Sequence, residues 1–490
     1  MVLWLIIIYF HIFAEKYQDM SMRKLLMAVI IMCGLIEANG QVERSASFHE
    51  KYTLKQVVVL SRHNIRSPLS GPESALGRIT PHEWFQWTSA PSELSLRGGV
   101  LETMMGQFFR KWLVSEGLMQ ENEMPAEGAM RFYANSMQRT IATAQYFSSG
   151  MLPVANADIE HHYSIGTMDP VFSPNITRDD EAFRKVVMQE IVDRFGNGST
   201  AGIGEAMREQ YALLEDVLDL KQSAACQQGD TCSFKTDDSV ITLTVGKEPS
   251  LKGSLSLACK AVDALVLQYY EEPDDLKAAF GHNLSLNDWQ KLSTIKDYYG
   301  DVLFSSPTLS TNLAHPLLKE MLSELKNEQR RFSFLCGHDS NLGSVLGALG
   351  WDEYTLPSSI EKTPIGAKLV IEKWQGSDGQ EYVAMNMVYQ STDQLRRMPL
   401  LSLQNPPVVY SMELKGLLCN DDGLFRLSDF EQQFSERIEA YDTDPTGIQT
   451  RKYNNSPSSA IVYNLQGQRL DKDSQNAGIY IKNGQKVLLK

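Results

Sequence analysis

Short apolar runs alternate with helical stripes along the chain. "QVVVL" at 56–60 is continuously apolar, which is typical of a strand covered on both faces. We also expect strands at "RFYA" (131–134) and "FSFLC" (332–336), and a helix-like segment follows each. Residues 95–117 carry an apolar stripe at helical spacing, formed by Val100, Met104, Phe108 and Trp112. This alternation predicts an α/β fold.

The second half of the chain adds antiparallel and helical signals. The segments "KLVIEKW" and "EYVAMNMVYQ" are joined by "QGSDGQ", which predicts a hairpin. "SDFEQQFSERIEAY" predicts a helix, with Ser428 and Glu431 placed for a capping box. Residues 175–325 differ, because they are rich in charge and helical patterns and hold few convincing strands. We therefore expect an α/β domain interrupted by a largely helical insertion.

These changes of pattern give the expected domain boundaries. The α/β domain is expected at 49–165 and 330–437, and the helical cap insertion at 166–329. Residues 438–457 have the Pro, Ser, Asn and Thr content of a linker. Residues 458–490 predict short strands around Gly and Asn turns, too few to form a stable domain alone. This tail resembles the sorting tails of proteins exported by the type IX pathway, and a small accessory β-hairpin is the alternative.

The N-terminal residues 1–40 are expected to be a signal region. "MRKLLMAVIIMCGLIEANGQ", from Met22, has a basic start, an apolar middle and small residues at Ala38 and Gly40, as a secretory signal peptide does. Its apolar span is short for a membrane helix. We expect the true start at Met20 or Met22 and no stable membrane insertion after signal removal. A membrane-anchored protein with a double apolar segment is the alternative.

Composition narrows the function further. The 490 residues carry a net charge of −14, which argues against general nucleic-acid binding. An anionic small molecule would therefore need a local basic pocket. In "CQQGDTC", Cys226 and Cys232 end a short polar loop, which favours a local disulfide in an oxidising compartment. A zinc site is the rival interpretation, but no nearby histidine or second cysteine pair completes it.

Arginine, histidine and aspartate side chains follow three of the predicted strands. The carboxyl ends of parallel strands form the binding crevice of open α/β sheets, and helix N-termini there favour anions. Singly, each side chain would suit a structural role, such as a salt bridge, a helix cap or a core histidine. Metal binding by the paired histidines is disfavoured because the neighbouring arginines repel a cation. Together they predict a phosphate site formed by Arg62, His63, Arg66, Arg139, His338 and Asp339.

Two motifs in these segments match a family pattern. "RHNIRSP" resembles the R-H-G/N-x-R-x-P signature of the histidine acid phosphatases, and "GHDSN" resembles their H-D element. The resemblance extends over about residues 49–437 and is strongest to the periplasmic glucose-1-phosphatase type, with which Asn64 agrees. It implies a three-layer, phosphoglycerate-mutase-like domain with a mixed, largely parallel sheet and an inserted helical cap. The subgroup's cysteine pair near Cys419 is replaced by Leu417 and Phe425, so no disulfide is expected there.

The resemblance also implies roles for the residues. His63 would be the nucleophile that forms a phosphohistidine, and Asp339 the proton donor. The phosphate would be bound by His338 and the three arginines, so that no metal or other cofactor is expected. In "VGKEPSLKGSLSL", Glu248 would contact the sugar hydroxyls of the substrate. The ordinary alternative for Glu248 is an exposed loop carboxylate.

The expected function is that of a secreted phosphomonoesterase acting on sugar phosphates, glucose 1-phosphate first among them. A phytase or broad-specificity acid phosphatase is the nearest alternative, and a mutase of related fold is another. A catalytically inactive surface binding protein is the alternative from a different class, but the intact set of site residues argues against it. The signal and the Asp339 that follows His338 favour hydrolysis. The expected partner is a small phosphate monoester, in the periplasm or at the surface of a bacterium, with the oligomeric state left open.

Overall fold

The computed structural model describes residues 44–441 except 72 and 179, together with the strands of the C-terminal tail. The expected signal region 1–40 and residues 442–457 of the expected linker lie outside this description. The chain up to Thr446 and the chain from Gly447 form two separate compact units. No helix in the described ranges is long and apolar enough to cross a membrane.

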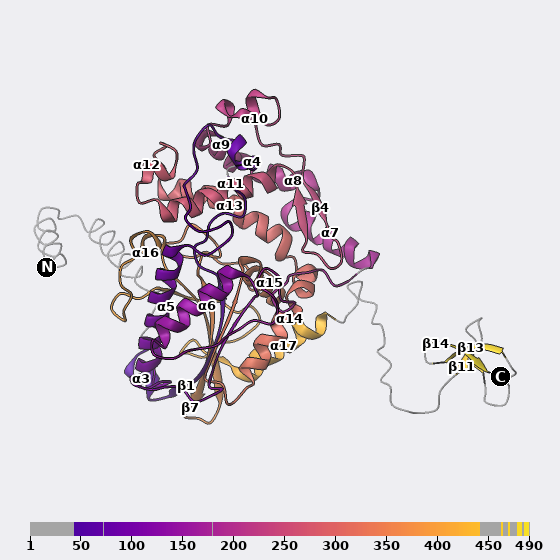
Figure 1. Cartoon of the computed structure of the whole chain (residues 1–490). Helices are drawn as coiled ribbons and strands as arrows, with labels where there is room; N and C mark the ends of the chain where they lie inside the picture. The colour runs from indigo at the N-terminus through magenta and orange to yellow at the C-terminus, as the bar shows by residue number, and fades with distance from the viewer. Residues whose placement is uncertain are drawn as a thin grey trace, which may run out of the picture. The chain divides into compact units, whose positions relative to one another are not determined.

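A mixed sheet forms the centre of the larger unit (Figure 1). Its strands follow the order β10-β8-β7-β1-β6-β2-β3, and β9 pairs with β8. Strands β1, β6, β2 and β3 run parallel, whereas β7 to β10 add antiparallel pairs, including the predicted β7–β8 hairpin. The strands are β1 (Tyr52–Arg62), β2 (Met130–Ala134), β3 (Ile159–Glu160), β6 (Phe332–Gly337), β7 (Lys368–Gly376), β8 (Glu381–Tyr389), β9 (Val408–Ser411) and β10 (Phe425–Arg426).

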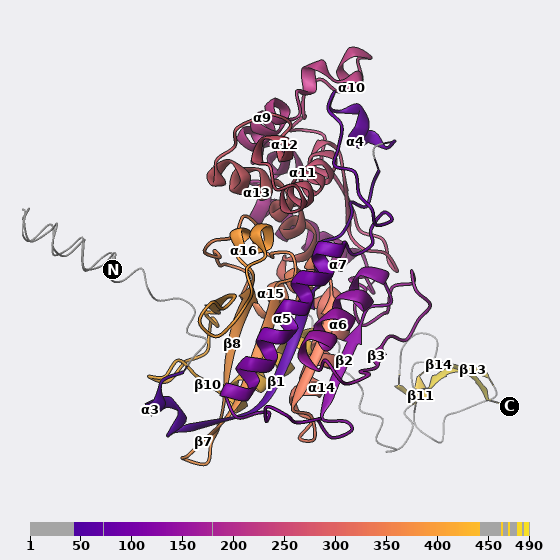
Figure 2. The same cartoon turned by 60° about the vertical axis from the view of Figure 1, so that its left-hand side comes forward.

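Helices cover both faces of this sheet, as the continuous apolar run of β1 predicts. Val57 and Val59 pack into one apolar cluster, and Val58 and Leu60 pack into a second one on the opposite face. One face carries α5 (Leu96–Ser115) and α6 (Gln138–Met151), as Figure 2 shows. The other carries α14 (Pro307–Leu325), α15 (Asp339–Leu349) and α17 (Leu427–Ala440). The three-layer α/β fold with a mixed sheet is thereby confirmed.

The register of the parallel strands brings the predicted site residues together. Arg62, at the end of β1, is aligned with Gly337 at the end of β6, and Ala134 of β2 is aligned with Cys336. All three strands therefore end at one edge of the sheet. Helix α15 starts directly after β6, with His338 at its N-cap.

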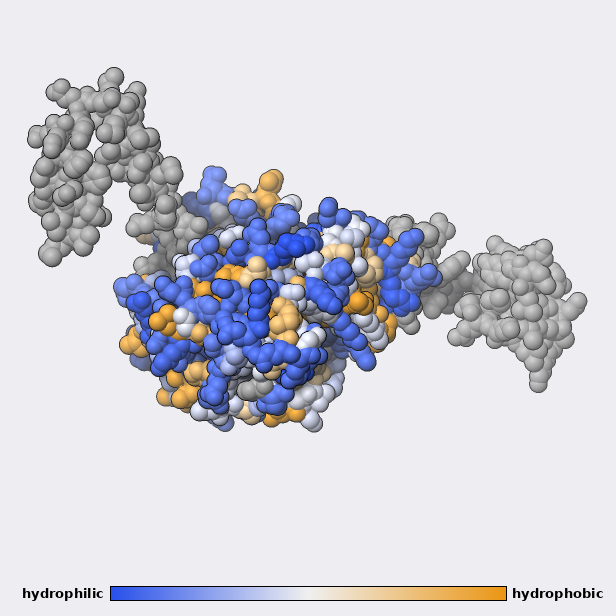
Figure 3. Space-filling view, turned by 90° about the horizontal axis from the view of Figure 1, so that it is seen from above, coloured by the Kyte–Doolittle hydropathy of each residue, from blue (hydrophilic) through white to orange (hydrophobic). Residues whose placement is uncertain are grey.

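The cap lies beyond this edge and is mainly helical (Figure 1). Within it the disulfide Cys226–Cys232 is formed, as expected. Seen from above, the outer face of the molecule is largely hydrophilic, with scattered apolar residues (Figure 3). The elements of the cap are α4 (Ala75–Arg78), α7 (Glu181–Phe195), α8 (Thr200–Glu205), α9 (Arg208–Val217), η1 (Leu220–Gln222), α10 (Ala224–Gln227), β4 (Val240–Thr242), β5 (Ser250–Lys252), α11 (Ser254–Glu271), α12 (Asp275–Ala278) and α13 (Leu286–Phe304).

Local details at the other end of the domain differ in part from expectation. The predicted capping box of Ser428 with Glu431 is wrong, because α17 begins at Leu427 with Arg426 at its N-cap. Strand β10 runs directly into this helix, so Ser428 already lies in the first turn, where its hydroxyl contacts Asp429. Cys419 is a free thiol, in agreement with the expectation of no disulfide at this place.

Two short helices and the tail complete the description of the fold. Helices α3 (Ala46–His49) and α16 (Thr392–Arg397) belong to the larger unit. The tail forms a four-stranded sheet of order β12-β11-β13-β14, in agreement with the predicted short strands. Its strands are β11 (Val462–Tyr463), β12 (Arg469–Leu470), β13 (Gly478–Lys482) and β14 (Gln485–Leu489).

Candidate active site

His63 lies at the centre of the sheet edge, directly after β1. It is buried, and its backbone N–H donates to the carbonyl of Gly337 at 3.0 Å, which ties it to the end of β6. Its Nδ1 lies 2.8 Å from the carbonyl oxygen of Asn64. Since a carbonyl only accepts hydrogen bonds, Nδ1 carries the ring proton and the lone pair is on Nε2.

The protonation state of His63 follows from its surroundings. Burial, and then the positive charges of Arg139 and Arg66, hold the pKa of His63 well below its usual value. The imidazole is therefore neutral at neutral pH. A neutral imidazole with a free Nε2 is able to act as a nucleophile.

His338 lies beside His63, as the sequence predicts from the two strand ends. The two rings meet edge to face, with their centroids 5.5 Å apart. The side-chain amide nitrogen of Asn135 lies 2.7 Å from His338 Nε2, and Nη2 of Arg139 lies 3.3 Å from Nδ1. Burial, followed by Arg139, lowers the pKa of His338 well below its usual value, so this ring is also neutral.

The three predicted arginines share one feature. In the described part of the chain, the Nε atoms of Arg62, Arg66 and Arg139 are buried and have no hydrogen-bond partner. A buried donor without a partner costs free energy, about 1–3 kcal/mol or more for a charged group. Burial, and then the neighbouring charge of Arg66, lower the pKa of Arg139 to about 10. An anion bound among these side chains would supply both the acceptors and the compensating charge.

Carboxylates hold two of the arginines in place. Arg62 Nη1 donates to Glu361 Oε1 at 3.0 Å, and Arg66 Nη2 donates to Asp263 Oδ2 at 3.0 Å. Glu361 is itself buried, and it also accepts from the Tyr270 hydroxyl at 3.0 Å. Because each guanidinium is anchored at one end, its remaining N–H groups keep a fixed direction.

Asp339 is the first residue of α15, and its side chain is more open to solvent than the arginines. Its Oδ2 lies 3.3 Å from Arg62 Nη2 and 3.9 Å from Lys296 Nζ. Burial alone would raise the pKa of this carboxyl, but Arg62, Lys296 and Arg66 together hold it far below its usual range. Without a bound anion, Asp339 is therefore a carboxylate.

Sequence reasoning missed Lys296, Glu361 and Asp263. Lys296 lies on α13 and contacts both Glu361 and Asp339, so it completes a buried chain of alternating charges. Asp263 lies on α11. No spacing rule links these cap positions to the strand ends. Glu361 lies shortly before the predicted strand "KLVIEKW", and no pattern in the sequence connects it with the three strand ends.

A buried polar cluster supports the loop that carries His63. Asn64 Nδ2 donates to Glu102 Oε2 at 2.7 Å, and Lys368 pairs with Glu102 Oε1 at 2.7 Å. Gly366 donates its N–H to the His63 carbonyl at 3.0 Å and has a φ of +68°. A Cβ at Gly366 would come within 2.5 Å of the Asn64 amide nitrogen, so the loop and Asn64 fit only against glycine.

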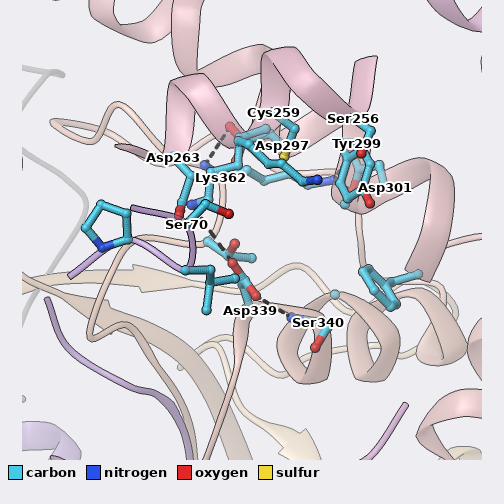
Figure 4. A pocket seen from close by; sticks show the side chains of 18 of the residues that line it. Ser70, Ser256, Cys259, Asp263, Asp297, Tyr299, Asp301, Asp339, Ser340 and Lys362 are labelled. Carbon is cyan, nitrogen blue, oxygen red and sulfur yellow. Dashed lines mark hydrogen bonds and ion pairs between the residues drawn. The ribbon is translucent and has the colours of Figure 1, made fainter. Parts of the chain in front are cut away.

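A cavity opens between the sheet edge and the cap helices α11 and α13, as Figure 4 shows. Arg66 and Asp339 of the predicted phosphate site are among the residues that line it. Its wall is rich in acidic and hydroxyl groups, and burial raises the pKa of one of them, Asp297, to about 7. The polar and charged residues of the wall include Ser70, Ser256, Lys260, Asp263, Lys296, Asp297, Tyr299, Asp301 and Lys362.

Glu248 lies in the loop between β4 and β5, and it is exposed, as the ordinary alternative expected. Desolvation by the surrounding protein and then the negative charge of Asp339 raise the pKa of Glu248, and Arg139 lowers it. Glu248 is not among the residues that line the cavity in the described structure.

Comparison with known proteins gives concordant matches. The sequence model of the Histidine phosphatase superfamily (branch 2) matches residues 53–388. The glucose-1-phosphatase of Salmonella typhimurium is 36% identical over 414 residues, which cover 84% of this chain and 98% of that protein. The glucose-1-phosphatase of Providencia rettgeri is 35% identical over 79% of this chain and 92% of its own length. Among solved structures, the apo form of Hafnia alvei phytase has a TM-score of 0.73 at 27% identity, covering 81% of this chain and 99% of that one.

Proposed function

Because the chain belongs to branch 2 of the histidine phosphatase superfamily and is a phosphomonoesterase, we propose that it hydrolyses sugar phosphates, glucose 1-phosphate first among them, through a phosphohistidine at His63. One observation carries this proposal. A neutral imidazole with a free Nε2 lies among three arginines whose buried Nε donors have no protein partner in the described chain. Such a site offers a nucleophile and the charge that a phosphoryl group needs.

In the first half-reaction, Nε2 of His63 attacks the phosphorus atom and the ester P–O bond breaks. The electron pair of that bond goes to the leaving oxygen of the sugar, which takes a proton from Asp339. Arg62, Arg66 and Arg139, with His338, bind the non-bridging oxygens and stabilise the charge of the transition state. The products of this step are the free sugar and a phosphohistidine.

The proton on Asp339 needs an explanation, because the carboxyl is ionised in the free protein. Arg62, Lys296 and Arg66 are the charges that lower the pKa of Asp339. A phosphate monoester that binds to Arg62 and Arg66 neutralises part of that positive charge and adds its own negative charge nearby. Both effects raise the pKa of Asp339, so that binding of the substrate itself prepares the acid.

In the second half-reaction, the carboxylate of Asp339 accepts a proton from water as the water oxygen attacks phosphorus. The P–N bond breaks, its electron pair returns to Nε2, and inorganic phosphate leaves. The same residue thus serves first as acid and then as base.

The cavity supports a neutral, hydroxyl-rich leaving group. Asp263 and Asp301 line it, and the charges of Asp339 and Arg139 at the catalytic edge shift the pKa of Glu248. Carboxylates accept hydrogen bonds from sugar hydroxyls and repel further phosphates, which disfavours highly phosphorylated inositols. Phytase activity is the second candidate, because Lys260 and Lys362 also line the cavity and Hafnia alvei phytase is a structural neighbour.

A phosphate-release panel on the purified protein tests the proposal. Glucose 1-phosphate, phytate and an aryl phosphate are compared side by side at acidic pH. We expect kcat/KM for glucose 1-phosphate to be higher than kcat/KM for phytate. A higher kcat/KM for phytate would favour phytase activity, the second candidate, over sugar phosphate hydrolysis. If no ester released phosphate, hydrolysis itself would be contradicted.

A further inference from the structure

A second group of potential ligands lies in the cap, outside the catalytic cavity. His82, Asp219 and His282 come from three segments that are far apart in the sequence, yet one ligand atom of each lies within 4.8 Å of the other two. Among the described residues it is the one group of three or more histidine, cysteine or acidic side chains with this spacing. All three side chains are partly buried. None of them lines the cavity that opens at Asp339.

The spacing of the ligand atoms suits a small transition-metal ion. Asp219 Oδ2 lies 2.7 Å from His82 Nε2 and 3.5 Å from His282 Nε2. Ligand bonds of about 2.0–2.2 Å in tetrahedral geometry place neighbouring ligand atoms about 3.3 Å apart. The two measured distances lie on either side of that value. Small side-chain shifts would therefore bring all three atoms to one ion.

The chemistry of the group also favours such an ion. Two imidazole nitrogens and one carboxylate oxygen are typical ligands of Zn²⁺ and similar metals, whereas Ca²⁺ and Mg²⁺ prefer oxygen alone.

A carboxylate lies near the second ring nitrogen of His282, with 3.9 Å between Nδ1 and the carboxylate of Asp216. The usual outer partner of a metal-bound histidine is a carboxylate that accepts a hydrogen bond from this nitrogen, so Asp216 would have to move closer to take that role.

We propose that His82, Asp219 and His282 bind one divalent transition-metal ion, of which Zn²⁺ is the reference, with water at the fourth position. The ion joins the segment after α4 to the segments before η1 and after α12. The ring of His82 stacks on Phe280, with centroids 5.0 Å apart, and Phe280 packs against Trp84. Trp84 donates to the carbonyl of Leu76, which lines the catalytic cavity. The metal thereby holds in place the residues that pack behind Leu76 in the cavity wall, and it takes no part in the chemistry.

Calorimetry and thermal unfolding of the full mature protein test this proposal. The protein carries no purification tag, since a histidine tag would itself bind the metal, and it is first treated with EDTA and dialysed. We expect saturable binding of one Zn²⁺ per chain and a rise in Tm that grows with Zn²⁺ concentration. Mg²⁺ and Ca²⁺ at the same concentration are expected to give neither effect.

Variants assign the binding to this group. His82→Ala and His282→Ala are each expected to weaken Zn²⁺ binding at least about tenfold, since loss of even an outer partner costs about 10–100-fold. The matched control is His49→Ala, because His49 pairs with a single carboxylate, that of Glu116, at 2.8 Å. It should bind Zn²⁺ as the wild type does.

Three results would overturn the proposal. These are the absence of saturable binding in the wild-type protein, unchanged affinity in both histidine variants, and equal binding of Ca²⁺ and Zn²⁺. The first and third are measured on the wild-type protein, so they hold even where a variant fails to fold.

Discussion

The carboxylate of Asp339 lies 3.3 Å from the guanidinium of Arg62. The proposed general acid is therefore paired with an arginine that, in the proposed mechanism, also binds the phosphate of the substrate. Arg62 is at the same time anchored to Glu361 at 3.0 Å. The pKa of Asp339 is therefore controlled by whatever occupies the arginine cluster. A free site keeps Asp339 ionised, and an anion between the arginines favours its protonation.

Asp339→Asn is expected to slow substrates with poor leaving groups most. Glucose and other alkyl alcohols need a proton as the P–O bond breaks, whereas an activated aryl leaving group departs without one. The measurement is kcat/KM for glucose 1-phosphate and for an activated aryl phosphate, because kcat/KM reports the step in which the leaving group departs and not the later hydrolysis of the phosphohistidine. Equal losses of kcat/KM on both substrates would show that Asp339 is not the general acid.

Lys296→Met is expected to move the alkaline limb of the kcat profile to higher pH. Lys296 lowers the pKa of Asp339, so its removal raises that pKa, and a general acid works at pH values below its pKa. The control is Lys362→Met, which removes another cavity lysine, one that pairs with Asp301 at 2.7 Å. A limb that stays in place, or moves equally in both variants, would contradict the link between Lys296 and Asp339.

Glu361→Gln is expected to weaken the dependence of stability on acidic pH. Lys296 and Arg62 outweigh the effect of burial and lower the pKa of Glu361 to about 2, from about 4.3 in an unfolded chain. A lowered pKa stabilises the fold above pH of about 4.3, and this contribution is lost as the pH falls toward 2. The free energy of unfolding should thus fall less steeply in the variant between pH of about 5 and 2. An unchanged slope would mean that this ion pair does not control acid stability.

Glu248→Gln is expected to narrow the preference for glucose 1-phosphate over phytate and to leave small aryl phosphates nearly unaffected. The neutral amide no longer repels the additional phosphates of phytate and accepts hydrogen bonds from sugar hydroxyls less strongly. The measurement is the ratio of kcat/KM values for the three esters. If the ratio of sugar phosphate to aryl phosphate is the same as in the wild type, the role of Glu248 has to be abandoned, although the phosphatase activity would not be in question.

The part of the site that lies on the sheet could be predicted from the sequence, and the part on the cap could not. Arg62, His63 and His338 follow apolar runs that become parallel neighbours, and the rule that parallel strands end at a common edge brings them together. Lys296 and Asp263 lie on helices of the cap. The apolar residues of these helices predict which face of each helix is buried, but they do not predict which polar residue contacts the catalytic edge.

Local rules failed where neighbouring elements decided the outcome. The predicted capping box at Ser428 was displaced because β10 continues directly into α17, a packing effect that the residues 428–431 do not encode. The sequence contains no metal-binding motif that would predict the proposed metal site. His82 and His282 are far apart in the chain, and only the folded cap brings them together.

The central claim is that the phosphoryl group passes through His63, and trapping that intermediate tests it most directly. The enzyme is mixed with glucose 1-phosphate and quenched during turnover at alkaline pH, at which phosphohistidine survives, and the digested peptides are analysed by mass spectrometry. Wild-type protein is expected to carry one phosphoryl group on the peptide that contains His63. His63→Ala is expected to carry none and to lose about 10⁴-fold or more in kcat, the usual scale for removal of a nucleophile. A phosphoryl group on any other residue, or phosphate release at near wild-type rate from His63→Ala, would contradict the account.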